Sequence, residues 1–313
     1  MTLKNFLEKI TFNQKEEEHR DEKGYRQLLK EIKTLQIKLK NVAHHSGFAQ
    51  SLSPFKGRGM EFYETRPYVE SDDVKSIDWN VTARLNKAYV KVYQEEHELN
   101  IMVAIDLTAS QEMASKKESK KTASLKIGAS IALSAITNGN KVSCLFFDDE
   151  VIEHFRPFKN KSNLPAFIQK AFFYRPKKKK TNLEKPLNEI NKFLKKRNII
   201  FLISDFLDNE KWKKALFNLS VRHDVYIIQI FDPLEKIFPK SGLVRMEDCE
   251  TGFSQVIDTS TNKFQQDYQQ LFQKHLEETR TIFRRLNLRH VCIDTSTNFF
   301  VQLDHFLKKQ TFS

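Results

Sequence analysis

The feature that most constrains the fold is an alternation of short apolar runs with longer amphipathic runs, which begins near Leu99. Two of the apolar runs, residues 100–105 and 199–203, are almost continuous, as is typical of strands that helices cover on both faces. The predicted strands are residues 100–105, 141–147, 151–155, 199–204, 225–231 and 289–293, and the predicted helices are residues 119–137, 164–172, 183–196, 210–219, 263–286 and 299–307. Because such alternation produces βαβ units, the sequence predicts an α/β fold with a doubly wound, mostly parallel sheet.

Two further segments precede this domain. In the first, apolar residues recur at spacings of one, three and four within a charged background, which predicts an N-terminal amphipathic helix that docks on the main body. These apolar residues are Leu28, Leu29, Ile32, Leu35, Leu39 and Val42. The second segment is richer in Gly, Pro, aromatic and β-branched residues, which favours a small β-rich subdomain. The expected organisation is a helical segment at 1–45, a β-rich subdomain at 46–97 and the α/β domain at 98–313.

The composition favours a folded cytoplasmic protein. Hydrophobic residues make up 40% and charged residues 29% of the chain, which argues against disorder. The three cysteines, Cys144, Cys249 and Cys292, lie far apart in mostly apolar surroundings, as reduced core cysteines do. The first residues do not form a signal peptide, and no apolar run approaches the roughly 20 residues that cross a bilayer. We therefore expect a cytoplasmic location and no membrane span.

Oxygen-bearing side chains follow the ends of two predicted strands. Asp106, Thr108 and Ser110 come directly after the first strand of the α/β domain, at alternate positions. Asp205 follows the fourth strand, and Thr181 precedes the third helix, where a cap or a metal-binding hydroxyl belongs. Because ligands bind at the carboxyl ends of parallel strands, we expect these five side chains to meet at one edge of the sheet.

These oxygen atoms are of the kind that hard cations prefer. Mg²⁺ takes about six oxygen ligands, commonly one or two carboxylates with hydroxyls and water. The five side chains therefore predict a site for Mg²⁺, or for Mn²⁺ or Ca²⁺, with one position left for an acidic residue of a partner protein. The sequence contains no P-loop, dinucleotide-binding or nucleophile-elbow motif, and no general base for a metal-dependent hydrolase is evident. We expect a binding protein rather than an enzyme, with no catalytic residues.

The predicted ligands resemble a known metal site. Asp106-x-Thr108-x-Ser110, together with Thr181 and Asp205, is similar to the metal-ion-dependent adhesion site (MIDAS) of von Willebrand factor type A domains. That site usually has Asp-x-Ser-x-Ser, so Thr108 keeps the hydroxyl and adds a methyl group. The resemblance implies a von Willebrand type A-like α/β domain that binds its partner through the metal ion.

A second resemblance covers roughly residues 45 to 310. The segment GRGMEFYETRPYVESDDVKSIDWNVTARLNKAYVKVYQEE at 57–96 resembles the bacterial domain-of-unknown-function 58 family (DUF58), as do DPLE at 232–235 and ETG at 250–252. Ser71-Asp72 stands where Gly-Asp is usual in that family. The resemblance implies a cytoplasmic bacterial adaptor or chaperone-like partner of a MoxR-type AAA+ ATPase.

The net charge of +12 leaves an alternative open, a basic nucleic-acid-binding protein. Arginines and aromatic residues alternate in the β-rich subdomain, as they do on surfaces where nucleic-acid bases stack on aromatic side chains. In strands, however, such alternation more often means that one face of the sheet is packed and the other is exposed to solvent. Lysines at 116–117, 120–121 and 177–180 are expected in a basic rim around the metal site or in solvated loops. Ile77-Asp78-Trp79 with Ala83-Arg84 is expected to be structural, with an Asp–Arg pair and a buried indole.

Overall fold

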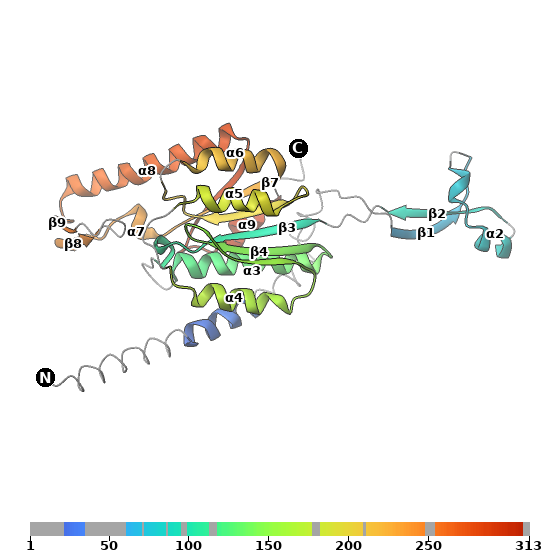
Figure 1. Ribbon diagram of the computed structural model, residues 1–313, viewed down its shortest axis with the longest axis horizontal. Helices are drawn as coiled ribbons and strands as arrows, with labels where there is room; N and C mark the ends of the chain where they lie inside the picture. Colours follow the sequence, from blue (N-terminus) through green and yellow to red (C-terminus); the bar gives the residue numbers. More distant parts are fainter. Residues whose placement is uncertain are drawn as a thin grey trace. The chain divides into compact units, whose positions relative to one another are not determined.

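The computed structural model of the chain describes residues 22–34, 61–70, 72–85, 87–94, 99–112, 118–176, 182–208, 211–247 and 254–308. The chain divides into two compact units (Figure 1). We call Met1–Leu52 together with Asn100–Ser313 the main unit, and Ser53–Leu99 the small unit.

The main unit contains a six-stranded sheet in the order β10-β7-β6-β3-β4-β5. The strands are β3 (Asn100–Asp106), β4 (Lys141–Phe147), β5 (Val151–Phe158), β6 (Ile199–Ser204), β7 (Asp224–Phe231) and β10 (Arg289–Asp294). Neighbouring strands pair in parallel except β4 and β5, which form an antiparallel hairpin. The predicted α/β fold with a mostly parallel sheet is confirmed, and each predicted strand is present.

Helices cover both faces of this sheet (Figure 1). They are α3 (Lys120–Thr137), α4 (Asn163–Phe173), α5 (Glu184–Phe193), α6 (Trp212–Arg222), α8 (Asn262–Arg285) and α9 (Phe299–Lys308). On one face, α3 lies over Val103 and Ile105, and Phe167 of α4 packs on Phe146 with ring centroids 5.9 Å apart. Ile105 and Phe146 share this face because they are partners in the strand register. Helix α9 covers the same face further along the sheet, through Tyr226.

The opposite face packs on α5, α6 and α8. Its buried strand residues include Met102, Leu145, Leu202 and Ile227, and the helices contribute Leu187, Trp212, Leu216 and Phe283. Removing an aliphatic or aromatic side chain of this size from water stabilises the fold by roughly 1.5–3 kcal/mol. Because helices cover both faces of the sheet, both sets of side chains on the central strands are buried, and their sequences are almost continuously apolar.

The contact between α3 and β3 depends on a glycine. A Cβ atom at Gly128 would lie 2.7 Å from Cδ1 of Ile105 and 3.1 Å from Cγ1 of Val103. The first of these distances is shorter than side chains tolerate, so α3 approaches β3 this closely only because residue 128 has no side chain. Glycine costs helix stability in the interior of α3, and the close packing offsets that cost.

Residues 22–34 form a helix that packs on the main unit. Leu28 and Ile32 on this helix are 1% and 6% exposed. Glu31 forms an ion pair with Lys126 of α3. The apolar residues of the predicted amphipathic pattern thus face the main unit here, whereas Leu35, Leu39 and Val42 lie outside the described residues.

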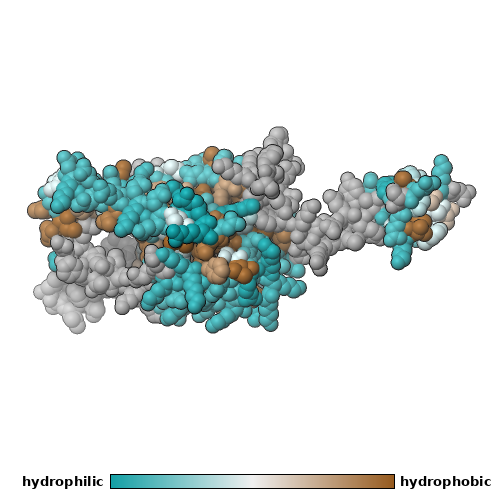
Figure 2. Space-filling model, turned by 90° about the horizontal axis from the view of Figure 1, so that it is seen from above, coloured by the Kyte–Doolittle hydropathy of each residue, from teal (hydrophilic) through white to brown (hydrophobic). Residues whose placement is uncertain are grey.

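The small unit is built on the antiparallel hairpin of β1 (Glu61–Pro67) and β2 (Tyr89–Gln94), with the short helix α2 (Trp79–Leu85) between them. Trp79 is 67% exposed, so the expectation of a buried indole is wrong. Asp78 pairs with Lys91 at 3.6 Å rather than with an arginine. Two strands and a two-turn helix provide too few layers to enclose an indole, and apolar side chains are visible on the surface of this unit (Figure 2).

The connection between β7 and α8 contains elements that the sequence did not predict. They are the one-turn helix α7 (Pro233–Lys236) and the antiparallel hairpin of β8 (Leu243–Glu247) and β9 (Ser254–Asp258). Among the described helices, none combines the length and the apolar character needed to cross a membrane.

Candidate metal centre

The sheet has a topological switch point between β3 and β6. From β3 the chain continues to β4 on one side, and it later enters β6 on the other side of β3. The connections from these two strands leave in opposite directions, which opens a crevice where ligands bind in sheets of this kind. Asp106 is the last residue of β3, and Asp205 directly follows the last residue of β6.

A chain of hydrogen bonds joins four of the five predicted ligand residues. Asp106 accepts hydrogen bonds from the Thr108 N–H at 2.9 Å and from the Ser204 hydroxyl at 2.6 Å. The hydroxyl oxygens of Thr108 and Ser110 lie 3.1 Å apart. Ser110 in turn donates to Oδ2 of Asp205 at 2.7 Å. The structure therefore brings Asp106, Thr108, Ser110 and Asp205 together at the carboxyl ends of β3 and β6.

The fifth predicted ligand, Thr181, lies outside the described residues, as do the lysines at 116–117 and 177–180. The start of α5 is described, and the N–H of Leu183 there donates to Asp208 at 2.8 Å. Because Asp208 belongs to the loop that follows β6, the segment that begins α5 is tied to the loop that carries Asp205.

The centre also contains a lysine that the sequence did not assign to it. Lys120, the first residue of α3, is 0% exposed. Its ammonium donates to Oδ2 of Asp205 at 2.7 Å and to Oε1 of Glu235 at 2.5 Å. Lys121 is also buried, and it donates to Glu112 and to a backbone carbonyl. The expectation that these two lysines lie in a basic rim or a solvated loop is therefore wrong.

Helix α7 holds Glu235 in place. Asp232 is the N-cap of this helix and forms a capping box with Glu235. Oδ1 of Asp232 accepts from the Leu234 N–H, and Oε2 of Glu235 accepts from the Asp232 N–H, both at 2.9 Å. One carboxylate oxygen of Glu235 is thus engaged by the start of α7, and the other faces Lys120.

Burial and charge together shift the ionisation of these groups. Burial, with repulsion from Asp205, raises the pKa of Asp106 to about 7. Burial also acts to raise the pKa of Asp205, but the adjacent Lys120 ammonium outweighs it and holds that pKa below its usual value. Burial acts to lower the pKa of Lys120, and the two carboxylates that it contacts outweigh this and raise it. Lys120 is therefore charged and compensates Asp205, and among the described residues no basic side chain hydrogen-bonds to Asp106.

The donor atoms fit a hard divalent cation. Carboxylate and hydroxyl oxygens are the ligands of Mg²⁺, and Asp106, Thr108, Ser110 and Asp205 supply both kinds. A divalent charge would also offset the repulsion between the two aspartates that raises the pKa of Asp106. Across the part of the chain that the structure describes, no three His, Cys, Asp or Glu side chains form a metal-binding group. The candidate ligands are accordingly two carboxylates with hydroxyl groups, a set suited to Mg²⁺ rather than to Zn²⁺.

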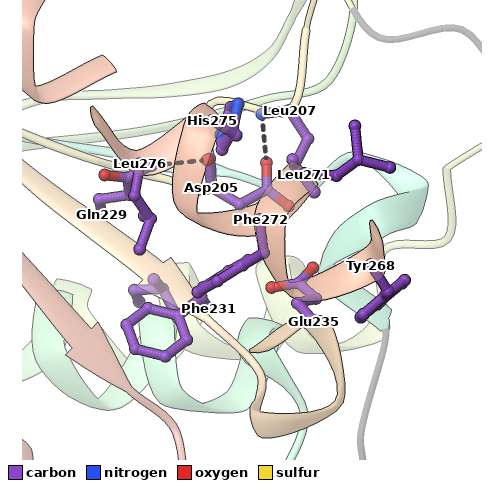
Figure 3. A pocket seen from close by; sticks show the side chains of 11 residues that line it. Asp205, Leu207, Gln229, Phe231, Glu235, Tyr268, Leu271, Phe272, His275 and Leu276 are labelled. Atoms are coloured by element: carbon purple, nitrogen blue, oxygen red, sulfur yellow. Dashed lines mark hydrogen bonds between the residues drawn. The ribbon is translucent and has the colours of Figure 1, made fainter. Parts of the chain in front are cut away.

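A cleft adjoins this centre (Figure 3). It has a volume of about 260 Å³ and lies between the ends of β6 and β7, α7 and α8. Its walls are mostly apolar and include Leu207, Phe231 and Phe272, and Asp205 and Glu235 are among its polar lining residues. The cleft is therefore an apolar recess that ends at the candidate metal centre.

Three residues of the centre were not predicted as such: Ser204, Lys120 and Glu235. Ser204 adjoins Asp205 at the end of a predicted strand, so the strand-end pattern that identified Asp205 was sufficient to find it. Lys120 is separated from Asp205 by 85 positions and from Glu235 by 115. Nothing local in the sequence distinguishes this buried lysine from a surface lysine.

The fold and the centre define a class of protein, an α/β protein with helices on both faces of a mostly parallel sheet and a buried charged centre at its switch point. The chain belongs to the DUF58 family, described as "Protein of unknown function DUF58", whose family model matches residues 64–278. The resemblance of the segments around the α/β domain to this family is thereby confirmed.

Similar proteins are known in several bacteria. The uncharacterized proteins Rv1480 of Mycobacterium tuberculosis and Mb1516 of Mycobacterium bovis are each 24% identical over 223 residues, which is 71% of this chain and 70% of the relative. Among solved structures, the conserved hypothetical protein BatB from Bacteroides thetaiotaomicron is 13% identical, with a TM-score of 0.45 over 69% of this chain and 100% of that one. An aerotolerance-related membrane protein from Bacteroides fragilis is 14% identical, with a TM-score of 0.43 over 68% and 100% of the two chains.

Proposed function

We propose that this protein is a metal-ion-dependent protein–protein interaction module with a von Willebrand factor type A-like domain. In this proposal Asp106, Thr108, Ser110, Thr181 and Asp205 hold Mg²⁺, or Mn²⁺ or Ca²⁺ in its place. The ion acts as a link between proteins, so the module binds a partner and does not catalyse a reaction.

The observation that carries the proposal is the hydrogen-bonded group of Asp106, Thr108, Ser110 and Asp205 at the switch point. These side chains come from the ends of two different strands, and they offer two carboxylates and two hydroxyls within one small volume. Burial raises the pKa of Asp106, and repulsion from Asp205 adds to it; a cation between the two carboxylates would offset that repulsion.

The partner that suits such a site is a protein with an exposed acidic residue. Two carboxylates do not complete the coordination of a divalent ion, so a carboxylate from another molecule can take a position that water otherwise occupies. We propose that this partner is a MoxR-type AAA+ ATPase and that the two proteins act together in the cytoplasm as an adaptor or chaperone-like pair. The apolar cleft beside Asp205 gives such a partner further surface to contact.

Metal binding tests the proposal directly. Isothermal titration of the full chain with MgCl₂ or MnCl₂ should show binding to the wild type, and Asp106→Ala should abolish it. Asp294→Ala is the matched control, because Asp294 also ends a strand at this edge of the sheet and its side chain accepts hydrogen bonds from nearby Ser296. Circular dichroism melts establish that each variant is folded. Equal heats from the wild type and Asp106→Ala would refute the assignment.

Partner binding is tested separately. Pull-down with the wild-type chain as bait should recover a MoxR-type ATPase in Mg²⁺ and lose it in EDTA, as read by mass spectrometry. If nucleic acid is recovered instead, and the complex weakens steeply with salt but not with EDTA, the alternative of a nucleic-acid-binding protein is favoured.

A further inference from the structure

Lys120 occupies a position that helix formation alone does not favour. It is the first residue of α3, where the helix dipole presents positive charge and a cation is disfavoured. The side chain is also fully buried, which makes an uncompensated ammonium costly. Two carboxylates offset both penalties, at 2.7 Å from Asp205 and 2.5 Å from Glu235. The location of Lys120 is therefore explained by the centre and not by the helix.

The ammonium uses the same oxygen atom that a metal ion would use. Oδ2 of Asp205 accepts hydrogen bonds from both Ser110 and Lys120, and Ser110 is itself a proposed metal ligand. Oδ1 of Asp205 is already engaged by the Leu207 N–H at 3.1 Å. A divalent ion bound to Oδ2 at about 2.1 Å would lie less than about 5 Å from the Lys120 nitrogen. At that separation in a buried site, the two positive charges repel each other strongly.

We propose that Lys120 competes with the divalent ion for Asp205, and that its ammonium gives up Asp205 and keeps its contact with Glu235 when the ion binds. In the metal-free protein, Lys120 compensates Asp205. In the metal-bound protein, the ion takes over Asp205 and Glu235 alone compensates the lysine. This inference rests on the proposed function and adds a determinant of its metal affinity.

Glu235 is suited to hold the lysine by itself, because it does not depend on the lysine for its own position. Its Oε2 is held by the Asp232 N–H in the capping box of α7, so Oε1 stays directed at Lys120. Glu235 also lines the apolar cleft beside the centre (Figure 3). Loss of the Lys120–Asp205 contact would therefore change the charge distribution at the cleft that we propose contacts the partner.

The test is isothermal titration of the full chain with MgCl₂, using variants that remove the charge of Lys120. Lys120→Met and Lys120→Gln should bind Mg²⁺ about tenfold more tightly than the wild type, or better, because the competing charge is absent. Lys120→Gln keeps N–H donors for the two carboxylates, so it preserves the fold if Lys120→Met does not. Lys121→Met is the matched control, since it removes an adjacent buried lysine that contacts Glu112 instead, and it should bind as the wild type does.

A second measurement uses the stability of the variants. Removal of the ammonium leaves Asp205 and Glu235 buried without a cation, so Lys120→Gln should melt at a lower temperature than the wild type in EDTA. Mg²⁺ should raise the melting temperature of Lys120→Gln by more than it raises that of the wild type.

The outcomes separate this inference from the proposed function. If the wild type and both Lys120 variants bind Mg²⁺ with equal affinity, the competition is refuted and the metal site stands. If none of the proteins binds Mg²⁺, the proposed function fails and this inference fails with it. If the Lys120 variants bind Mg²⁺ and the wild type does not, the competition is supported, because the ammonium then excludes the ion from the wild-type site.

Discussion

The two tryptophans of this chain lie in two contrasting regions. Trp212, in the main unit, is 2% exposed and packs edge-on against Phe206, with ring centroids 5.2 Å apart. Phe283 of α8 completes the cluster, at 5.0 Å from Phe206 and 5.9 Å from Trp212. Trp79, in the small unit, is 67% exposed at the start of α2. The same residue type thus forms part of a core in one unit and of the surface in the other.

The difference shows that the surrounding layers of sheet and helix determine whether a tryptophan side chain is buried. Trp212 lies where a six-stranded sheet and two helices converge, so the indole is covered on several sides. In the described part of the small unit, Trp79 is accompanied by a two-stranded hairpin, a one-turn 3-10 helix at Val74–Ser76 and its own short helix. A family-like motif such as Ile77-Asp78-Trp79 therefore does not by itself identify a core residue, because burial depends on elements that the motif does not contain.

The largest effect is expected from Trp212. Trp212→Ala removes the centre of the aromatic cluster and should lower the free energy of unfolding by about 3–5 kcal/mol. Urea unfolding followed by circular dichroism measures this loss. Trp212→Phe is the control, because it keeps an aromatic ring and removes an indole N–H that bonds to none of the described residues, so it should cost much less. A loss below about 1 kcal/mol for Trp212→Ala would mean that the cluster is not the core that we describe.

An intermediate effect is expected from pH, through a histidine beside the same cluster. His290 packs on Phe283 with ring centroids 4.9 Å apart and planes tilted by 44°, and its burial, with repulsion from Arg280, lowers its pKa to about 4. Above pH 6.5 the histidine is neutral in both the folded and the unfolded chain. As the pH falls from 6.5 to 4 only the unfolded chain takes up a proton, so stability is lost, by at most about 3 kcal/mol.

The measurement is the urea midpoint between pH 7.5 and pH 4 for the wild type and His290→Gln. The variant should lose less stability as the pH falls. Burial also lowers the pKa of His154 and His223, so part of the acid sensitivity should remain in the variant. Identical pH profiles for the two proteins would show that His290 is accessible to protons in the folded state, and that the edge of the cluster at Phe283 is more open than its burial indicates.

The smallest effect is expected from Trp79. Trp79→Ala should change the free energy of unfolding by less than about 0.5 kcal/mol, because the side chain is already mostly in water. Acrylamide quenching makes the contrast sharper: fluorescence of Trp212→Phe, which retains only Trp79, should be quenched strongly, and that of Trp79→Phe weakly. Equal quenching in the two variants would remove the distinction between the two regions.

The sequence predicted the main unit well because its signals are local. The runs that became β3 and β6 are almost continuously apolar, and α5 and α8 have clear amphipathic patterns. The antiparallel direction of β5 follows from the short Asp148-Asp149 turn, which leaves no room for a crossover. The hairpin of β8 and β9 was missed because its strands are short, with Leu243 and Val256 exposed instead of packed on a core.

The candidate centre was predicted in part for the same reason. Asp106, Thr108, Ser110 and Asp205 directly follow apolar strands, so a local pattern identified them. Lys120 was not identified, because its role depends on Asp205 and on Glu235, which reach it through the folded chain alone. A sequence pattern can supply the anions of a centre and still omit the cation that balances them.

The missing side chain at Gly128 bears on the spacing of this centre as well as on packing. Gly128 brings α3 against Ile105, which is one residue before Asp106. The same helix begins at Lys120, about two turns away along a rigid rod. Coordination bonds allow errors of only a few tenths of an ångström, whereas a lysine on a flexible stem adapts to larger ones. An added methyl group at residue 128 must be accommodated by a shift of the Ile105 side chain or of α3 itself, and a coordination site would tolerate a shift of α3 less well than the lysine does.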